Sequence, residues 1–454
     1  MDLALVYRWV DEHKDECIEA LRTLVRQPSC ASQNLGVSEC AALLVNMMKS
    51  IGMEASAIGA GGQPFVVGKV ASSKSPKTLV VYNHYDVQPP EPVEEWKYPP
   101  FSATLDGGKI YGRGTTDSKG NLMAHLLAVK AYKQVHGDVP VNVKYLFDGE
   151  EEISSPTITR FVAENKDMLK ADAAMSLDGG FDASNRPRIQ FGSSGMEYVE
   201  IRATGSTAGD LHSARARLVE NPAWKLVWLL STMKDRNERI LIEGFYDDVR
   251  GPTPEERKLL EINGWDDEKQ MGVLGVKKFL TGVTGVAALQ RLLYQPTCNI
   301  AGISSGYTIL GGRKTVLPAK AFVKIDCRLV PNQRPEDIFQ KIKRHVEKQN
   351  LEGIEVKDFG GVAPSHAPLE SDISTAVINA AKAVYPQGPG LQPRGDASGK
   401  QGPWLGTQLG IPGVSSGIGP PDWHGHAPNE VMTVEHFLNG IKYVATIYAN
   451  YAAV

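Results

Sequence analysis

The chain has 454 residues, of which 42% are hydrophobic and 22% are charged, and its formal net charge is −3 at pH 7. This length exceeds what one hydrophobic core usually supports, so we expect a globular protein of two domains. The nearly balanced charge gives no electrostatic footprint for nucleic acid or for an anionic membrane surface.

The N-terminal residues 1–27 mix acidic and apolar side chains at the spacing of an amphipathic helix. They lack the basic start and apolar core of a secretory signal, and no stretch of the chain approaches the ~20 apolar residues that span a bilayer. The five cysteines are odd in number and show no C-x-x-C spacing, which argues against a disulfide framework or a zinc-thiolate site. We therefore expect a cytoplasmic protein with reduced thiols and no membrane partner.

Three short apolar runs end in side chains that can bind metal ions. The runs and the residues that follow them are 78–82 with His84 and Asp86, 143–147 with Asp148, Glu150, Glu151 and Glu152, and 173–177 with Asp178. Such runs are typical of buried strands, and an open α/β sheet places its chemistry at the carboxyl ends of its strands. Three consecutive glutamates there repel one another unless a strong cation lies among them, although on its own a solvated acidic turn explains the run equally well.

Asp117 precedes a segment with apolar residues at helical spacing, so we expect it at the start of a helix that opens onto the same strand ends. An aspartate at a helix start is usually an N-cap, and a histidine alone is more often a hydrogen-bonded residue than a ligand. After a late strand at 413–418, however, His426 supplies a second histidine. Two histidines and four or five carboxylates at one sheet edge exceed what capping requires, so the pattern predicts a metal site.

The candidate ligands stop at Asp178 and resume only at His426, which implies an inserted domain. From residue 192 the pattern gives a strand, an apolar helix, a charged stretch and paired strands, a grouping typical of an α+β fold. A helix at 373–384 and a final strand and helix at 434–451 would complete the first domain. The predicted fold class is therefore α/β, a mixed-sheet domain that carries the metal site (residues 1–193 and 363–454) with an inserted α+β lid domain (residues 194–362).

Several motifs, taken in chain order, carry a resemblance to a known family. They are His84-Tyr85-Asp86, Asp117-Ser118-Lys119-Gly120, Glu151-Glu152, Asp178 and His426-Ala427-Pro428-Asn429-Glu430. In this order they resemble the M20 family of dinuclear metallopeptidases and amidohydrolases. Residues 210–213, 316–318 and 328–333 are similar to the branch that holds carnosinase-like dipeptidases. The resemblance therefore covers nearly the whole chain.

The resemblance implies two divalent metal ions per chain, with Zn²⁺ as the first choice and Mn²⁺ or Co²⁺ as alternatives. Asp117 would bridge the two ions, because a dinuclear hydrolytic site needs a shared carboxylate. His84 and Asp178 would complete one metal site, and Glu152 and His426 would complete the other.

The same resemblance assigns the residues that handle protons. Glu151 would act as the general base that activates the metal-bridged water, because the family pattern places the base directly before the ligand glutamate. Spacing alone would not choose Glu151 over Glu150. Asp86 would fix the imidazole tautomer of His84 and raise its basicity as a ligand.

Further site residues are implied in the insertion and in a late loop. By composition His212 is more simply a surface histidine, but the matching histidine in family dimers reaches into the partner's active site and stabilises the oxyanion. This implies a homodimer. Arg328, Ser398 and Gly395 look like contacts to a substrate carboxylate, for which the planar, bidentate donors of arginine are suited.

The implied activity is metal-dependent hydrolysis of an amide bond in a small substrate, a dipeptide or a C-terminal peptide bond. The chain departs from the family pattern, because residues 394–403 lack the usual Glu-Gly-Gly-Ser-Ile-Pro and Arg215 and Arg217 make the lid more cationic. The alternative is therefore an amidohydrolase that removes an N-acyl or N-carbamoyl group from an amino acid or a related non-peptide amide.

Two other classes of protein fit the sequence less well. Residues 302–306 and 413–417 both match G-x-S-x-G, but neither match leads straight into a helix, as the nucleophile elbow of a serine hydrolase must. A metal-free binding protein of the same fold would be expected to have lost ligands or base, and here all of them are present.

Overall fold

The computed structural model describes residues 1–399 and 401–454, so Lys400 in the predicted substrate loop lies outside the described residues. The chain forms two compact units. The first contains Met1–Gly192, His366–Pro393 and the C-terminal stretch to Val454, and the second contains Ser193–Ser365 and Arg394–Gly399. The short segment Arg394–Gly399 thus belongs to the second unit, whereas the sequence prediction assigned it to the first.

The first unit is built on an eight-stranded sheet with the order β1-β2-β6-β3-β7-β18-β8-β17. Its strands are β1 (Glu54–Ile58), β2 (Phe65–Val70), β3 (Thr78–His84), β6 (Asn142–Asp148), β7 (Ala173–Leu177), β8 (Arg188–Gln190), β17 (Gly390–Gln392) and β18 (Gly413–Ser416). Strands β6, β3, β7 and β18 run parallel, while β1 and β2 are antiparallel to their neighbours. The predicted mixed sheet is confirmed.

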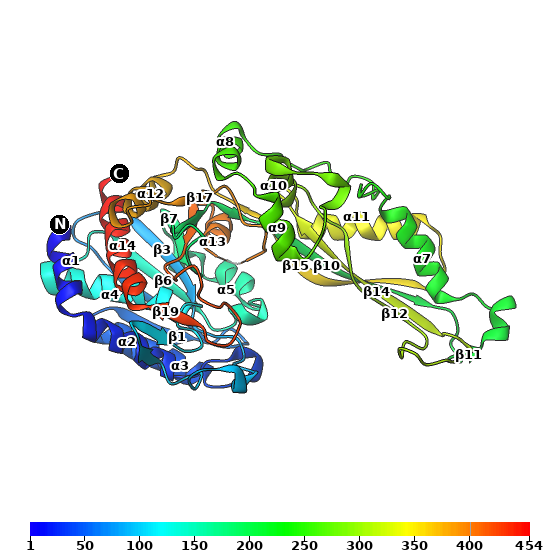
Figure 1. Ribbon diagram of the computed structural model, residues 1–454, viewed down its shortest axis with the longest axis horizontal. Helices are drawn as coiled ribbons and strands as arrows, with labels where there is room; N and C mark the ends of the chain where they lie inside the picture. Colours follow the sequence, from blue (N-terminus) through cyan, green and yellow to red (C-terminus); the bar gives the residue numbers. More distant parts are fainter. Residues whose placement is uncertain (400) are drawn as a thin grey trace. The chain divides into compact units, whose positions relative to one another are not determined.

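Helices cover both faces of this sheet (Figure 1). They are α1 (Leu3–Glu12), α2 (Lys14–Arg26), α3 (Val37–Ser50), α4 (Lys119–His136), α5 (Ile158–Glu164), α6 (Lys166–Leu169), α12 (Asp372–Val384), α13 (Gly402–Leu409) and α14 (Val434–Ala453). Helix α4 packs against α14 and is buried over most of its length, as expected for a helix that is apolar on nearly every side. A small sheet of β4 (Thr104–Asp106), β5 (Lys109–Tyr111) and β19 (Val431–Thr433) completes the unit.

The single N-terminal helix predicted from the sequence is wrong, because two helices meet at His13. The ring of His13 stacks on Trp9, and its Nδ1 lies 2.9 Å from the carbonyl oxygen of Trp9. The backbone of His13 leaves the helical conformation there (φ −109°, ψ 26°), and α2 restarts directly afterwards. A side chain that bonds the preceding turn offers the backbone an alternative to a continuous helix.

The second unit has a four-stranded antiparallel sheet with the order β12-β14-β10-β15. Its strands are β10 (Gly195–Thr204), β12 (Asn299–Ser305), β14 (Lys320–Leu329) and β15 (Ile354–Val362), and a two-stranded ribbon pairs β11 (Leu211–His212) with β13 (Val316–Leu317). The helices are α7 (Pro222–Met233), α8 (Pro254–Asn263), α9 (Asp267–Leu274), α10 (Gly285–Tyr294) and α11 (Pro335–Lys348). Helices α7 and α11 pack on the sheet (Figure 1), so the predicted α+β character is confirmed.

The two-residue strands β9 (Gly192–Ser193) and β16 (Ser365–His366) lie where the chain passes from one unit to the other. Within the described ranges, no helix has both the length and the apolar character needed to cross a lipid bilayer.

Neither match to G-x-S-x-G leads into a helix, because one lies at the end of β12 and the other in β18 and the loop after it. The serine-hydrolase alternative therefore lacks its structural context.

Candidate metal centre

The parallel pairing of three strands brings the predicted metal ligands to one sheet edge. Strand β3 ends at His84, which lies opposite Asp148 at the end of β6, and β7 ends one residue before Asp178. The acidic run then turns through a short 3-10 helix, Glu151–Ile153, at the same edge. The carboxyl ends of parallel strands are the usual location of an α/β active site.

Three side chains form the compact core of the centre. His84, Asp117 and Glu152 each offer one ligand atom, and these atoms all lie within 4.8 Å of one another. His84 is fully buried, and only small parts of the Asp117 and Glu152 side chains are exposed. One nitrogen and two carboxylate groups in so small a volume are a donor set that suits a divalent cation.

Asp117 lies between the two predicted histidine ligands. Its Oδ1 lies 2.9 Å from His84 Nε2, and its Oδ2 lies 3.1 Å from His426 Nε2. The residue is not an N-cap, because helix α4 begins two residues later and its N-cap position is Ser118. Burial alone would raise the pKa of Asp117, but the neighbouring His426 and His84 rings outweigh it and hold the pKa below its usual range.

Two buried atoms of this cluster lack a hydrogen bond to any of the residues that the structure describes. They are His84 Nε2 and Glu152 Oε1. Buried polar atoms without a partner are rare in folded proteins because each costs desolvation free energy. Both atoms belong to the compact core, so a bound cation is the partner that fits their position and chemistry. The residues present therefore fit a metal ion.

The remaining predicted ligands lie beside this core. Asp178 Oδ1 is 3.7 Å from His84 Nε2, and Asp178 Oδ2 accepts a hydrogen bond from Gln401 Nε2 at 2.6 Å. On the other side, His426 Nε2 is 3.4 Å from Glu152 Oε2, and 56% of its side chain is exposed. The structure thus brings all five predicted ligands into one cluster.

Asp86 is fully buried and organises the centre from behind. Its two carboxylate oxygens accept the backbone N–H groups of Glu151 and Glu152 at 3.1 and 3.0 Å. The Nδ1–H of His84 donates to the carbonyl oxygen of Asp86 at 3.1 Å, with the Asp86 carboxylate 3.4 Å from the same nitrogen. Because a carbonyl can only accept, the proton lies on Nδ1 and the lone pair of Nε2 faces the cluster.

The pKa values of the acidic run reflect crowding of negative charge. Burial raises the pKa of Glu151 to about 8 against the opposing effect of His84, and the charges of Asp178, Asp117 and Glu152 raise it further. Burial and the charge of Asp117 likewise raise the pKa of Glu152 to about 7. Such a site takes up either protons or a cation, and a cation would lower both pKa values again.

Sequence reasoning did not assign a role to Glu430, although it lies in the quoted His426 motif. Its buried carboxylate accepts the backbone N–H groups of Gly114, Thr116 and Asp117 and pairs with Arg113 Nη1 at 2.9 Å. These bonds hold the loop that presents Asp117. Its place in the motif was the only signal, since a glutamate in a polar stretch is usually exposed.

Two glutamines were also missed. Gln88 Nε2 donates to Glu152 Oε2 at 2.8 Å, and Gln401 donates to Asp178 as described above. Each amide fixes one carboxylate oxygen of a predicted ligand, and for Glu152 the other oxygen, Oε1, has no hydrogen bond to a described residue.

The predicted substrate contacts lie in the second unit. Arg328 Nη1 donates to Ser398 Oγ at 2.9 Å, so these two side chains are brought together. The carbonyl oxygen of Gly395 accepts the backbone N–H of Ser194 at 3.2 Å, which holds the loop. His212 is exposed in the ribbon of β11 and β13, and its Nδ1 accepts the N–H of Ala214 at 3.2 Å.

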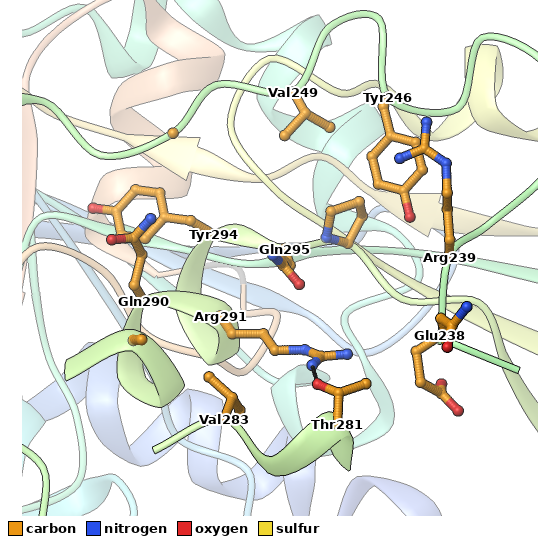
Figure 2. A pocket seen from close by; sticks show the side chains of 14 residues that line it. Glu238, Arg239, Tyr246, Val249, Thr281, Val283, Gln290, Arg291, Tyr294 and Gln295 are labelled. Atoms are coloured by element: carbon orange, nitrogen blue, oxygen red, sulfur yellow. Dashed lines mark hydrogen bonds between the residues drawn. The ribbon is translucent and has the colours of Figure 1, made fainter. Parts of the chain in front are cut away.

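The second unit also contains an open cavity of about 630 Å³ between α10 and the segments around Tyr246 and Thr281 (Figure 2). Arg291 Nη1 donates to Thr281 Oγ1 at 2.5 Å, and the guanidinium of Arg239 lies 5.5 Å from the centre of the Tyr246 ring. Its lining includes neither histidine nor cysteine, and Glu238 is its one carboxylate. This cavity therefore lacks the ligand chemistry of the metal centre.

Comparison with known proteins identifies the family. The sequence profile of peptidase family M20/M25/M40 matches residues 80–450. The Cys-Gly metallodipeptidase of Schizosaccharomyces pombe is 32% identical over 365 residues, which is 77% of this chain and 76% of that protein. The human β-Ala-His dipeptidase is 29% identical, over 76% of this chain and 71% of its own length.

Solved structures agree with this relationship. The M20 metallo-carboxypeptidase Sso-CP2 of Sulfolobus solfataricus has a TM-score of 0.88 and 36% identity, with 97% of this chain and all of that chain covered. Human carnosine dipeptidase 1 has a TM-score of 0.77 and 26% identity, with 100% and 99% covered. The chain therefore belongs to the peptidase family M20/M25/M40 and is an enzyme of its metallodipeptidase branch.

Proposed function

We propose that this enzyme hydrolyses the peptide bond of dipeptides with Glu151 as the general base. The observation that carries the proposal is the His84, Asp117 and Glu152 cluster, with two unpartnered buried ligand atoms directly beside a glutamate of raised pKa. A carboxyl in that position can take a proton at neutral pH and return it later in the same reaction.

We further propose that the cluster holds two divalent ions, with Zn²⁺ as the first choice. The ligands would be His84, Asp117, Glu152, Asp178 and His426, with Asp117 shared. When bound, such ions polarise an amide carbonyl and make water a stronger acid. The mixed nitrogen and oxygen donor set is the basis for zinc, and Mn²⁺ or Co²⁺ would suit the same set.

Glu151 then moves the protons of the reaction. It would take a proton from the attacking water, and the same carboxyl would give that proton to the leaving amine when the C–N bond breaks. Asp86 supports this role, because its carboxylate binds the backbone N–H of Glu151 and of the next residue and so fixes the acidic turn.

The second unit would bind the substrate's carboxylate. Arg328 offers planar donors for a carboxylate, and Ser398 lies within hydrogen-bonding distance of it. Gly395 would contribute to the same contact through the loop that the backbone of Ser194 holds. Dipeptides and C-terminal residues of peptides carry a free carboxylate of the kind that Arg328 and Ser398 would bind.

His212 would stabilise the oxyanion from a partner subunit in a homodimer. It is exposed at the surface of the second unit, as a group that acts across an interface must be. Helix α7 of that unit also presents exposed apolar side chains, including Trp224 (56%) and Trp228 (55%), which suit an interface between two copies of the chain.

The experiment is a substrate comparison with Zn²⁺, Mn²⁺ or Co²⁺ added to the purified chain. β-Ala-His and Cys-Gly, which the names of the relatives suggest, would be compared with N-acetyl-His and N-carbamoyl amino acids. β-Ala-His and N-acetyl-His release the same histidine, so their ratio isolates the preference for a peptide over an acyl group. We expect dipeptides to be cleaved with the higher kcat/KM. Turnover of only the acyl or carbamoyl compounds would support the amidohydrolase alternative instead.

A further inference from the structure

Two of the five cysteines, Cys298 and Cys327, lie directly opposite each other on neighbouring strands of the second unit. Strands β12 and β14 are antiparallel with Asn299 opposite Asp326, so the preceding residue Cys298 is opposite Cys327. One step further, the N–H of Thr297 donates to the carbonyl oxygen of Arg328 at 3.0 Å. The cysteines therefore occupy a position between two hydrogen-bonded pairs.

This type of position brings side chains closest together in an antiparallel ladder. Opposite residues in a non-hydrogen-bonded pair have Cα atoms about 4.5 Å apart, within the ~4.4–6.8 Å range of disulfide-bonded cysteines. Both side chains point into the core between the sheet and helices α7 and α11, and each thiol affects the pKa of the other. The strand register therefore places the two cysteines at a separation that a disulfide can span.

The two thiols differ in access and in acidity. Cys298 is 8% exposed at the rim of the core, while Cys327 is fully buried. The neighbouring Cys327 thiol, together with the charge of Lys234, lowers the pKa of Cys298 against the effect of burial. The Cys298 thiol and burial raise the pKa of Cys327 well above its ordinary value. Since the thiolate is the reactive form, Cys298 is the thiol that a small oxidant meets first.

We propose that a hydroperoxide oxidises Cys298 and Cys327 and that the two cysteines then form a reversible disulfide with each other. The Cys298 thiolate attacks one peroxide oxygen, the O–O bond breaks, and the released hydroxide leaves as water with a proton, which gives a sulfenic acid. The Cys327 sulfur then attacks the Cys298 sulfur, the S–O bond breaks, and the hydroxyl leaves as water with the Cys327 proton. Two thiols are oxidised by two electrons and one hydrogen peroxide is reduced to two water molecules.

The disulfide would join the start of β12, an edge strand of the sheet, to β14. It would close the chain between the two cysteines, which includes all of β12 and strand β13. A cross-link of this kind stabilises the fold mainly by restricting the unfolded chain. Because all five proposed metal ligands belong to the other unit, metal content should not change. The inference does not depend on the proposed function.

The test treats the purified chain with a small excess of hydrogen peroxide under native conditions. We expect the loss of two hydrogen masses per chain, a peptide that links Cys298 to Cys327 after non-reducing digestion, and full reversal by dithiothreitol. The thermal midpoint of the second unit should rise on the order of 5 °C. Amide exchange in β12 and β14 would assign that rise to the cross-linked strands.

Single variants provide the controls. Cys298→Ser and Cys327→Ser should each abolish the mass loss and the cross-linked peptide. In Cys327→Ser, the sulfenic acid on Cys298 should persist long enough for a sulfenic-acid probe to label it. Cys17→Ser is the matched control, because burial raises the pKa of the Cys17 thiol to about 12, and this variant should form the disulfide as the parent does.

Two results would overturn the proposal. One is peroxide treatment of the folded parent that gives sulfinic or sulfonic acid on Cys298 without any link to Cys327. The other is an equal mass loss in the parent and in Cys298→Ser. A Cys298→Ala variant guards against a folding defect of the serine variant, and its native state would be checked by circular dichroism.

Discussion

Buried acids behave differently in the two units of this enzyme. In the second unit, buried Glu256 receives two hydrogen bonds from Arg250 and closes the capping box of helix α8 with Thr253. In the first unit, Glu152 is close to Asp117 and His426, and one of its oxygens has no hydrogen bond to a described residue. A buried charge that the fold itself neutralises is structural, whereas one left over indicates a ligand that the chain does not encode.

Of the tests below, metal removal should have the largest effect, and only on the first unit. A chelator should abolish peptide hydrolysis, and added Zn²⁺, Mn²⁺ or Co²⁺ should restore it, because the cluster then regains its missing positive charge. Elemental analysis of the active enzyme should approach two divalent ions per chain. Metal should also raise the thermal midpoint of the first unit without changing amide protection in β10 of the second. Full activity in a metal-free preparation would refute the proposed function.

The acidic run allows a sharper separation of roles. Glu151→Gln keeps the size of the side chain and removes the proton acceptor, so kcat should fall by about 10²–10⁴-fold while metal content is retained. Glu152→Gln should lose metal affinity as well, measured by competition with a chromogenic chelator.

Glu150→Gln is the matched control within the same run. Its carboxylate accepts the N–H of Gln63 at 2.8 Å and the hydroxyl of Thr157 at 2.5 Å, so its role is structural. We expect reduced stability with kcat largely retained. If Glu150→Gln were inactive and Glu151→Gln active, the assignment of base and neighbour would be wrong by one residue.

His212 tests whether the second unit takes part in chemistry at all. If it stabilises the oxyanion, His212→Ala should lower kcat by about 10²–10³-fold with no loss of metal. Co-expression with Glu151→Gln would yield heterodimers in which one site has its own Glu151 and the partner subunit's His212. Activity above both parents, with heterodimers verified by mass, is the expected result. Verified heterodimers without such activity would contradict a role across the interface.

The first unit also contains a buried charge that the fold itself neutralises, in the ion pair between Arg113 and Glu430. Both side chains are fully buried, and removal of one partner of such a pair typically costs about 3–5 kcal/mol. Glu430→Gln should therefore lower the free energy of unfolding of the first unit. It should weaken metal binding too, because the amide keeps only one of the two oxygens that accept N–H groups of the Asp117 loop. Chemical denaturation with and without metal measures both effects, and unchanged metal affinity would separate the loop from the centre.

The sequence placed the proposed metal ligands at one sheet edge for a physical reason. Strand β3 pairs in parallel with β6 and β7, so residues that follow three apolar runs necessarily meet at one edge. Contacts between residues that are far apart in the chain leave no comparable pattern in the sequence. Glu430 pairs with Arg113 at a separation of 317 residues, and Cys298 faces Cys327 only because of strand register. Both depend on tertiary neighbours that composition and periodicity do not encode.

Glu197 lies in the second unit but resembles the buried acids of the first. It is 1% exposed in β10, its Oε1 has no hydrogen bond to a described residue, and no histidine lies among the groups that set its pKa. Burial raises the pKa of Glu197 to about 9, with further contributions from Asp358 and Glu336. The native state therefore holds a proton at neutral pH that the unfolded chain releases.

The sign of the effect on stability follows from this difference. Between the unfolded pKa of about 4.5 and the folded value, the native state binds one more proton at Glu197. The contribution of Glu197 to stability is therefore greatest below the unfolded pKa and is lost as pH rises towards the folded pKa. Glu197→Gln is neutral in both states and should raise the unfolding free energy of the second unit at pH 7 by about 1–3 kcal/mol. The variant should also flatten the pH dependence, measured by amide exchange in β10.

Glu200→Gln is the matched control on the same strand, where loss of the 2.6 Å contact with Arg202 should give no gain in the free energy of unfolding. A parent protein whose β10 protection does not fall between pH 5 and pH 8 would show that Glu197 is ionised and that a partner holds its charge.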